Sequence, residues 1–293
     1  MSLQVIVVGA SSGRAAARSA LSLEPMTSDP EHAPLPAWGP PRANRAKRRL
    51  AAGGVATVVA GHSMSADSID FLGPHGFDAV WLEAEHGPAD WERLGDLSRA
   101  CDLWGLSALL RLRTLGPSLV GRALSLGVHG IVIPQIGGAD QVRALVEAAK
   151  FAPIGRRGVS RGRRSYGRPD FLATDNDETL LVVQIEDPDA LAHCEEIAAV
   201  PHLDVAFIAP NDLAQAMGFP GQPGHPEVVA AVEQGLARIA GVGGAAAGTL
   251  CSGDAGPRLI GLGARFLYVS TDAWVAQAAA AWLGSVRGAE RGA

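Results

Sequence analysis

LLVVQIEDPDA at 180–190 and DVAFIAPNDLAQAMG at 204–218 are the two stretches that decide the fold of this chain. Each is a short apolar run that ends abruptly in polar residues, the first at Gln184 and Glu186, the second at Asn211 and Asp212. Such runs are typical of parallel strands buried on both faces. Acidic residues at neighbouring strand ends lie on the rim where α/β enzymes place their chemistry. Glu186 and Asp212 therefore predict a site for a hard divalent cation.

Six further segments repeat the strand-like pattern, and helical patterns separate most of the eight, as in 88–104, 139–150 and 226–240. Strands alternating with helices predict an α/β fold, a closed (β/α)8 TIM barrel. The span 44–293 is close to the ~250 residues that such a barrel needs; an open doubly wound sheet is the alternative. The predicted strands are 55–61, 78–84, 107–112, 130–135, 180–186, 204–209, 245–250 and 265–270.

The first 43 residues differ from the rest of the chain. The stretch 24–42 is rich in proline and poor in apolar residues, so we expect 1–43 to be an extension, flexible or an over-long start, and 44–293 to form one barrel domain. VIVVGASSGRAAARSA at 5–20 has the strand, glycine turn and helix of a dinucleotide site. No βαβ unit follows it, so a reductase is the weaker alternative.

Composition limits the possible partners and compartments. The net charge of −5 does not favour nucleic-acid binding, and no apolar run approaches the ~20 residues of a membrane helix. Cys101, Cys194 and Cys251 lie far apart without metal-site spacing. They are typical of buried thiols in a reducing compartment, and we expect a cytoplasmic protein.

Further polar residues follow the other predicted strands. Glu83, Glu85 and His86 end the second strand, and a histidine on a tight HGP turn suits acid–base chemistry near neutral pH. Arg111 ends the third strand, where burial requires a carboxylate or an anionic substrate as partner. The first and last strands lead to His62, Ser270 and Asp272. The rim thus collects cations and carboxylates at one end of the barrel.

Each of these features has a plainer explanation. Glu186 and Asp212 could cap the helices that follow them. The segment 156–168, with six arginines, is either a solvated or subunit-contacting loop or a cationic lip for an anionic substrate. The chain has only two lysines, Lys47 and Lys150, and neither falls at a predicted strand end, which weakens a Schiff-base mechanism.

The chain resembles the HpcH/HpaI family of class II, metal-dependent 2-oxo-acid aldolases. The motifs that carry the resemblance span about 44–282: FDAVWLEAEHGP, ALLRLR, GIVIPQI, PIGRRGVS, VVQIED, and FIAPNDLAQAMG followed by HPEV. The resemblance implies a TIM barrel of the phosphoenolpyruvate/pyruvate-binding type. It also implies a carbon–carbon lyase that converts a 4-hydroxy-2-oxo acid to and from pyruvate and an aldehyde. The implied cofactor is Mg²⁺, Mn²⁺ or Co²⁺, and the implied assembly is a homo-oligomer, hexamer or trimer, with a swapped C-terminal helix.

The resemblance also assigns roles to residues of the rim. It implies that Glu186 and Asp212 are the metal ligands and that His86 is the acid–base residue. It implies that Arg111 faces the oxo acid and that Gln184 lies on the substrate side. The backbone at Ala209 and Pro210 would hold the pyruvate carboxylate, and Glu83 and Glu85 would support the site.

Two positions depart from the pattern of the family. Glu83 stands where many members carry a shorter acid, and Ser125 stands where many carry an aspartate that pairs with the catalytic histidine. A serine cannot raise the basicity of a histidine as a carboxylate does. This leaves two rivals open, a non-catalytic oligomer and an acyl-CoA lyase of the citrate lyase or malyl-CoA lyase type, for which the arginine-rich segment would bind the CoA. The sequence does not identify the aldehyde.

Overall fold

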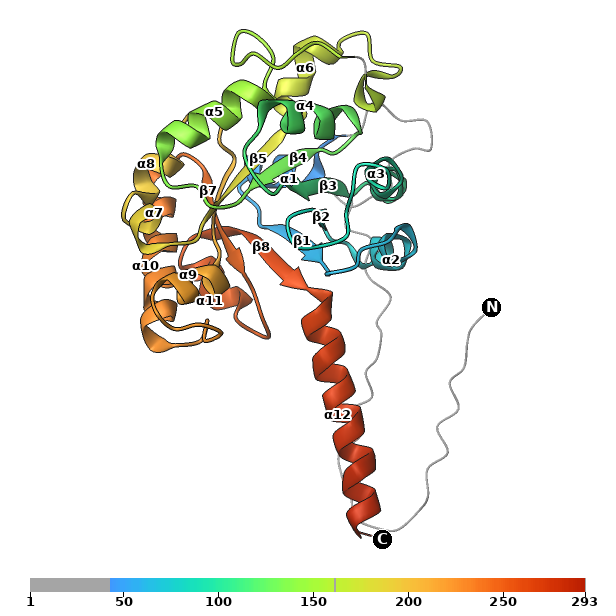
Figure 1. The fold of residues 1–293 in the computed structure, drawn as a ribbon, viewed down its shortest axis with the longest axis vertical. Helices are drawn as coiled ribbons and strands as arrows, with labels where there is room; N and C mark the ends of the chain where they lie inside the picture. The colour runs from blue at the N-terminus through green and yellow to red at the C-terminus, as the bar shows by residue number, and fades with distance from the viewer. Residues whose placement is uncertain (1–42, 161, 293) are drawn as a thin grey trace. The chain divides into compact units, whose positions relative to one another are not determined.

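The computed structural model describes residues 43–160 and 162–292, all within one compact unit of the chain, Pro34–Ala293. Their strands are all parallel and close into a barrel in the order β1 to β8, which confirms the predicted (β/α)8 fold and excludes the open sheet (Figure 1). The segment 5–20, and with it the dinucleotide alternative, lies outside the described residues. The strands are β1 Ala56–Ala60, β2 Ala79–Glu83, β3 Ser107–Arg111, β4 Gly130–Ile133, β5 Leu180–Ile185, β6 Val205–Ile208, β7 Ala246–Leu250 and β8 Ala264–Ser270.

Between the first and the last strand, helices follow the strands and bury apolar side chains against the outside of the barrel. One predicted boundary is wrong: α3 begins at Leu94 and not at 88, because the Asp90 side chain accepts the N–H groups of Glu92 and Arg93 in a turn before the helix. The helices are α1 Arg45–Ala51, α2 Ala66–Leu72, η2 Gly73–His75, α3 Leu94–Leu103, α4 Pro117–Ser125, α5 Ala139–Ala149, η3 Arg163–Ser165, α6 Phe171–Glu178, α7 Pro188–Ala192, α8 Cys194–Ala198, α9 Pro210–Ala216, α10 Pro226–Val242, α11 Gly256–Gly261 and α12 Thr271–Gly292.

Alternate residues of each strand point into the barrel and fill it. Trp81, Phe207 and Tyr268 meet there, with the ring of Trp81 centred 5.5 Å from Phe207 and 5.2 Å from Tyr268. Because successive side chains on a strand face opposite sides, Glu83 and Gln184 share the interior face with the apolar residues below them. The last interior positions of the strands therefore supply the polar groups at the C-terminal end of the barrel.

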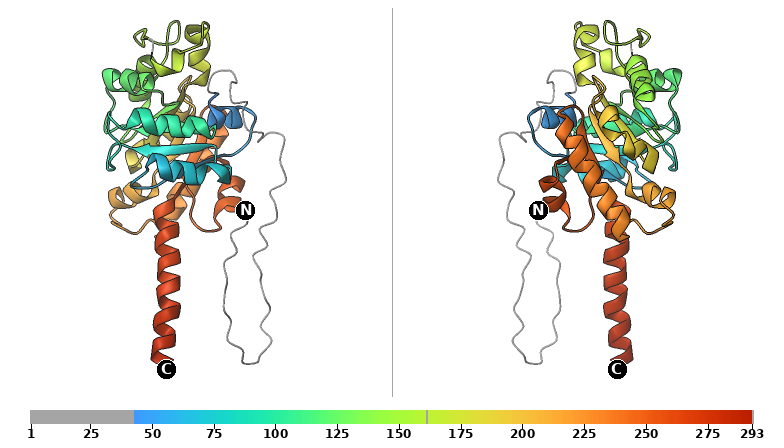
Figure 2. Two further views of the ribbon diagram at one scale, coloured as in Figure 1. Left: turned by 90° about the vertical axis from the view of Figure 1, so that its right-hand side faces the viewer. Right: turned by 90° about the vertical axis from the view of Figure 1, so that its left-hand side faces the viewer.

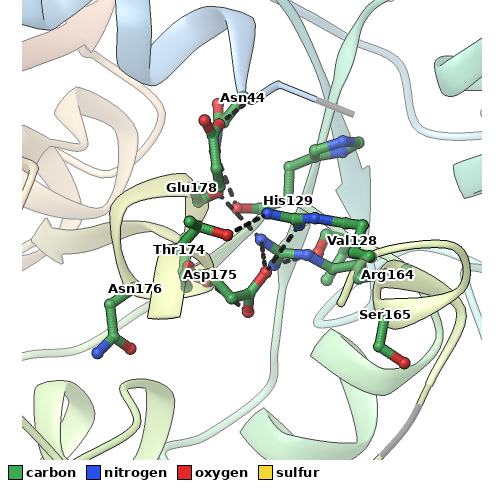
Figure 3. A network of polar contacts seen from close by, with 12 residues as sticks. Asn44, Val128, His129, Arg164, Ser165, Thr174, Asp175, Asn176 and Glu178 are labelled. Atoms are coloured by element: carbon green, nitrogen blue, oxygen red, sulfur yellow. Dashed lines mark hydrogen bonds and ion pairs between the residues drawn. The ribbon is translucent and has the colours of Figure 1, made fainter. Parts of the chain in front are cut away.

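The N-terminal end of the barrel is closed by α1. Ala46 is fully buried with the interior residues, and Asn44 caps the helix by accepting the Lys47 N–H at 3.1 Å. The Asn44 amide also donates to the carbonyl oxygens of His129 at 2.9 Å and Glu178 at 3.1 Å (Figure 3). Within the described residues, the interior therefore opens towards solvent at the C-terminal end of the strands.

The arginine-rich segment packs at this closed end. Arg164 contacts the fully buried Asp175 at 2.6 Å and donates to the Val128 carbonyl (Figure 3). Arg157 contacts the same carboxylate at 2.7 Å, and Arg168 lies 3.6 Å from it. The predicted cationic lip is therefore wrong for these three arginines. The physical reason is connectivity, since a segment that leads from a helix to the next strand lies at the end of a barrel opposite the active site.

The last helix, α12, does not pack along the barrel. It leaves the end of β8, and residues 272–289 are all exposed (Figures 1 and 2). Large apolar side chains lie along it, among them Trp274, Trp282 and Val286. In the part of the chain that the structure describes, no helix has the length and apolarity needed to cross a membrane.

Candidate active site

The two predicted metal ligands lie at adjacent strand ends. Glu186 follows β5 directly, is only 8% exposed, and accepts the Gln135 N–H at 3.0 Å through Oε2. It is not a helix cap, because Asp187 takes that role by accepting the Ala190 N–H at 2.8 Å. Asp212 is exposed in the first turn of α9, whose N-cap is Ala209. Both carboxylates are thus left for another function.

The electrostatics of this pair suit a cation. Burial, and then the charge of Asp212, raise the pKa of Glu186 to about 7. The Gln135 N–H and the more distant Arg111 counteract this only in part. The described residues contain no group of three or more His, Cys, Asp or Glu side chains arranged for a metal ion. A site with two carboxylates is therefore suited to a Mg²⁺-like ion, which keeps most of its coordination positions for water and substrate.

Arg111 is held in place by polar side chains at the ends of β2 and β5. Its Nε and Nη2 atoms lie 2.7 and 2.6 Å from Oε2 of Glu83, and Nη1 lies 3.1 Å from Glu85 and 3.3 Å from Gln184. Burial alone lowers the pKa of this guanidinium, but the contacts with Glu83 and Glu85 leave it raised. The predicted need for a carboxylate partner is met within the chain. Arg111 is therefore a fixed positive charge beside the carboxylate pair.

The other oxygen of Glu83 holds the turn that carries His86. Its Oε1 accepts the N–H groups of Glu85 at 2.7 Å and His86 at 3.1 Å. The His86 side chain is 68% exposed, with Nε2 3.7 Å from Glu85. Burial raises the pKa of Glu85. The structure thus brings together Glu83, Glu85, Arg111 and Gln184, while His86 lies on the same turn with its ring towards solvent.

The predicted carboxylate loop has fewer donors than its sequence suggests. The Ala209 N–H donates to the Ile185 carbonyl at 3.0 Å, and Pro210 has no N–H. The next backbone donors are those of Asn211 and Asp212, in the first turn of α9, where helical N–H groups have no partner within the helix. Any binding of a substrate carboxylate by this loop depends on those two groups.

Ser125 does not bear on His86 of the same chain. It is the last residue of α4, its hydroxyl donates to the Gly121 carbonyl at 2.9 Å, and its backbone packs against Gly162 of the arginine-rich segment. It therefore lies at the closed end of the barrel. Within one chain, Ser125 is therefore not a partner of His86.

Both lysines also lie at the closed end. Lys150 is 1% exposed, and its Nζ donates to the carbonyls of Asn176 and Thr179, each at 2.6 Å. Lys47, in α1, donates to the same Thr179 carbonyl at 2.8 Å. Neither amine reaches the rim that holds Glu186, which agrees with a mechanism without a Schiff base.

Sequence reasoning missed two contributions to the site. One is the backbone of Gln135, which takes a φ of 55° and donates to Glu186. The other is Tyr268, which lies within electrostatic range of Arg111 and Glu83. The alternation of Phe266, Tyr268 and Ser270 along one face of a strand was a signal for the second. The backbone angle of Gln135 had no signal in the sequence.

Comparison with known proteins identifies the family. The family model of the HpcH/HpaI aldolase/citrate lyase proteins matches residues 61–272. A pyruvate aldolase of Rhizobium etli is 37% identical over 207 residues, which cover 69% of this chain and 81% of that protein. A 4-hydroxy-2-oxo-heptane-1,7-dioate aldolase of Escherichia coli is 31% identical over 230 residues, covering 77% and 88%.

A solved structure supports the same family. An HpcH/HpaI aldolase/citrate lyase family protein from Burkholderia cenocepacia superposes with a TM-score of 0.76 at 30% identity, covering 83% of this chain and 99% of that one. These matches confirm the predicted family and the predicted class of enzyme, a carbon–carbon lyase. This chain belongs to the HpcH/HpaI aldolase/citrate lyase family.

Proposed function

We propose that this protein is a divalent-metal-dependent aldolase that interconverts a 4-hydroxy-2-oxo acid with pyruvate and an aldehyde. The observation that carries the proposal is the buried Glu186 beside Asp212, with a fixed Arg111 close by. The names of the relatives, a pyruvate aldolase and a 4-hydroxy-2-oxo-heptane-1,7-dioate aldolase, support the same reaction.

Glu186 and Asp212 would hold Mg²⁺, Mn²⁺ or Co²⁺, which supplies a Lewis acid for the oxygens of the oxo acid. Arg111 is held by Glu83 and Glu85, so its charge is already in place where the ketone oxygen becomes negative. Gln184 presents its amide beside Arg111 to orient the oxo acid. His86, on the exposed turn, removes the proton from the hydroxyl that becomes the aldehyde oxygen.

Two features of the single chain weigh against the rival functions. The acyl-CoA reading depended on the arginine-rich segment, whose Arg157, Arg164 and Arg168 are buried around Asp175 at the closed end. The non-catalytic reading depended on Ser125, which lies at that end as well. Neither feature adjoins the carboxylate pair.

The closing experiment follows proton exchange at the pyruvate methyl group, which needs no aldehyde. We expect exchange in D2O with Mn²⁺ or Mg²⁺, seen by NMR as loss of the methyl signal. EDTA and Glu186→Ala should each abolish it, whereas Glu196→Ala, at an exposed position of α8, should leave it unchanged. Exchange that survives both EDTA and Glu186→Ala would refute the metal mechanism.

We also propose a homo-oligomer in which α12 of one copy packs on another, as a hexamer or trimer. A largely apolar hollow of about 580 Å³ lies between α2 and the start of α12, lined in part by Met64, Phe77 and Trp274. It offers an apolar surface for the exposed face of a second α12, on which Trp282 is 65% exposed. Light scattering should give a multiple of the chain mass, and Trp282→Glu should reduce it.

We further propose that residues 44–293 form one domain and that the protein works in the cytoplasm. Support for the domain comes from α1, which closes the barrel from Asn44 onwards. Support for a reducing compartment comes from the cysteines: Cys101, Cys194 and Cys251 are free thiols, and the first two are buried. Limited proteolysis that first cleaves between α1 and β1 would contradict the proposed boundary.

A further inference from the structure

A glutamine with an unusual backbone conformation lies beside the candidate metal ligands. Gln135 comes two residues after β4 and has a φ of 55°, in the left-handed region. The other described residues with positive φ are glycines, apart from His202. Left-handed angles are uncommon for residues other than glycine, and asparagine, aspartate and histidine adopt them most readily. Glutamine is not one of these, so the conformation of Gln135 has to be imposed by its surroundings.

The residues on either side of Gln135 impose this conformation. Pro134 is buried, and Ile136 is 1% exposed and donates its N–H to the Gln184 carbonyl at 3.3 Å. One residue further on, the Gly137 N–H donates to Oε1 of the Gln141 side chain at 2.6 Å. Because the chain is held before and after it, Gln135 cannot return to an extended conformation unless buried neighbours move.

The left-handed conformation directs a backbone donor at a metal ligand. The Gln135 N–H donates to Oε2 of Glu186 at 3.0 Å, whereas the Gln135 side chain is exposed. Since φ is the rotation about the N–Cα bond, its value sets the direction of this N–H relative to the fixed Ile136. No hydrogen bond within the described residues uses Oε1 of Glu186. One carboxylate oxygen is therefore held by the backbone, and the other is left for a cation.

We propose that Gln135 is a positioning residue for the metal ligand Glu186, and that it acts through its backbone and not through its side chain. The strained conformation orients the Glu186 carboxylate before any metal binds. Groups that hydrogen-bond a metal ligand orient it, and their loss typically lowers metal affinity about 10- to 100-fold. The inference rests on the proposed metal-dependent function and adds the segment of the fold that prepares its ligand.

His202 provides a matched control for the strain itself. It has a φ of 68° and lies in the turn between α8 and β6, at the opposite end of the barrel from Glu186. A β-branched side chain at a positive φ is a genuine outlier, so valine conflicts with the backbone at either position. Only at Gln135 does the strained residue donate its N–H to a candidate metal ligand. The two positions therefore separate a general loss of stability from a loss of ligand orientation.

The test compares Gln135→Val with His202→Val in Mn²⁺ binding, followed by the EPR signal of the free ion. Both variants should melt at a lower temperature than the wild type in EDTA, because both carry the conflict with the backbone. Gln135→Val should raise the Kd for Mn²⁺ about 10-fold, whereas His202→Val should keep it within about 2-fold of the wild type. Gln135→Gly, which adopts left-handed angles readily and keeps the N–H, should restore the wild-type Kd.

A second measurement needs neither metal nor a folded Gln135→Val protein. In EDTA, amide hydrogen exchange at Gln135 should be at least about 10-fold faster in Glu186→Ala than in the wild type, because the N–H loses its acceptor. Exchange at Ile136 is the internal control. Its N–H bonds to the Gln184 carbonyl, which the substitution leaves in place, so its rate should stay the same.

Several results would overturn the inference. An unchanged Kd in Gln135→Val, or an equal rise in His202→Val, would show that the strain has no bearing on the metal. A Gln135→Gly protein that binds Mn²⁺ as weakly as Gln135→Val would show that the side chain acts and not the backbone. Equal exchange at Gln135 in Glu186→Ala and the wild type would refute the contact. A wild-type protein that binds no Mn²⁺ would refute the proposed metal site, and the inference with it.

Discussion

Replacing Glu186 by glutamine removes a charge that the metal-free protein has to bury. The side chain is 8% exposed, and its pKa lies at about 7, above the ordinary 4.5. Between these pH values the folded state keeps a proton that the unfolded state has released, so the free energy of unfolding falls as pH rises from 4.5 to 7. At about 1.4 kcal/mol per pH unit, the ionised carboxylate costs the metal-free fold up to ~3 kcal/mol.

Glu186→Gln keeps an oxygen for the Gln135 N–H but does not titrate. In EDTA at pH 8 we expect the variant to be more stable than the wild type by about 1 to 3 kcal/mol, the lower value allowing for burial of the amide. At pH 5 the difference should nearly vanish, because the wild-type carboxyl is then protonated when folded. Urea denaturation at both pH values, with Glu196→Gln as an exposed control, measures this.

Metal should reverse the ranking of the two proteins. A divalent ion at about 1,000 times its Kd would stabilise the wild type by ~4.1 kcal/mol, more than the deficit in EDTA, and leave Glu186→Gln almost unaffected. A variant that is no more stable than the wild type in EDTA at pH 8, or a difference that is the same at pH 5 and pH 8, would refute the picture of Glu186 as an uncompensated buried charge.

Three other substitutions test the two ends of the barrel. Asp175→Asn should cost about 3 to 5 kcal/mol in urea denaturation, because it leaves buried arginines without their carboxylate, while the activity of the folded fraction stays normal. Burial, and then Lys47, lower the pKa of Lys150 from 10.5 to about 7, so wild-type stability should rise from pH 7 to pH 10. Lys150→Met should flatten that rise in the same assay; an unchanged slope would contradict it. Arg111→Lys should reduce kcat about 100-fold in steady-state cleavage, because one ammonium nitrogen cannot replace the three guanidinium nitrogens that contact Glu83 and Glu85.

The sequence predicted the barrel because its strands are buried on both faces. Short apolar runs such as 180–185 and 205–208 have a clear length and a polar end, and each predicted strand matches an observed one within about two residues. The polar residues at the strand ends also predicted the positions of Glu186 and Arg111, because the C-terminal ends of barrel strands lie at the face that holds the active site. The start of α3 was missed because the Asp90 turn depends on side-chain bonds that the apolar pattern does not record.

The location of the arginine-rich segment was predicted wrongly, because the prediction relied on its composition. Six arginines suggested an exposed surface, although their position between a helix and a strand already favoured the closed end. The exposure of the His86 ring and the contact of Tyr268 with Trp81 depend on side-chain packing across the barrel. Such contacts join residues that are far apart in the chain, so a local pattern cannot predict them.

The distribution of amines has a consequence for an enzyme that handles aldehydes. Free aldehydes form imines with lysine side chains, whereas guanidinium groups stay protonated and are poor nucleophiles at neutral pH. This chain has 25 lysine and arginine residues, only two of them lysines, and both side-chain amines are hydrogen-bonded at the closed end of the barrel. The described barrel therefore has almost no accessible side-chain amine with which an aldehyde substrate could form an imine. Prolonged incubation with glycolaldehyde should leave its mass nearly unchanged.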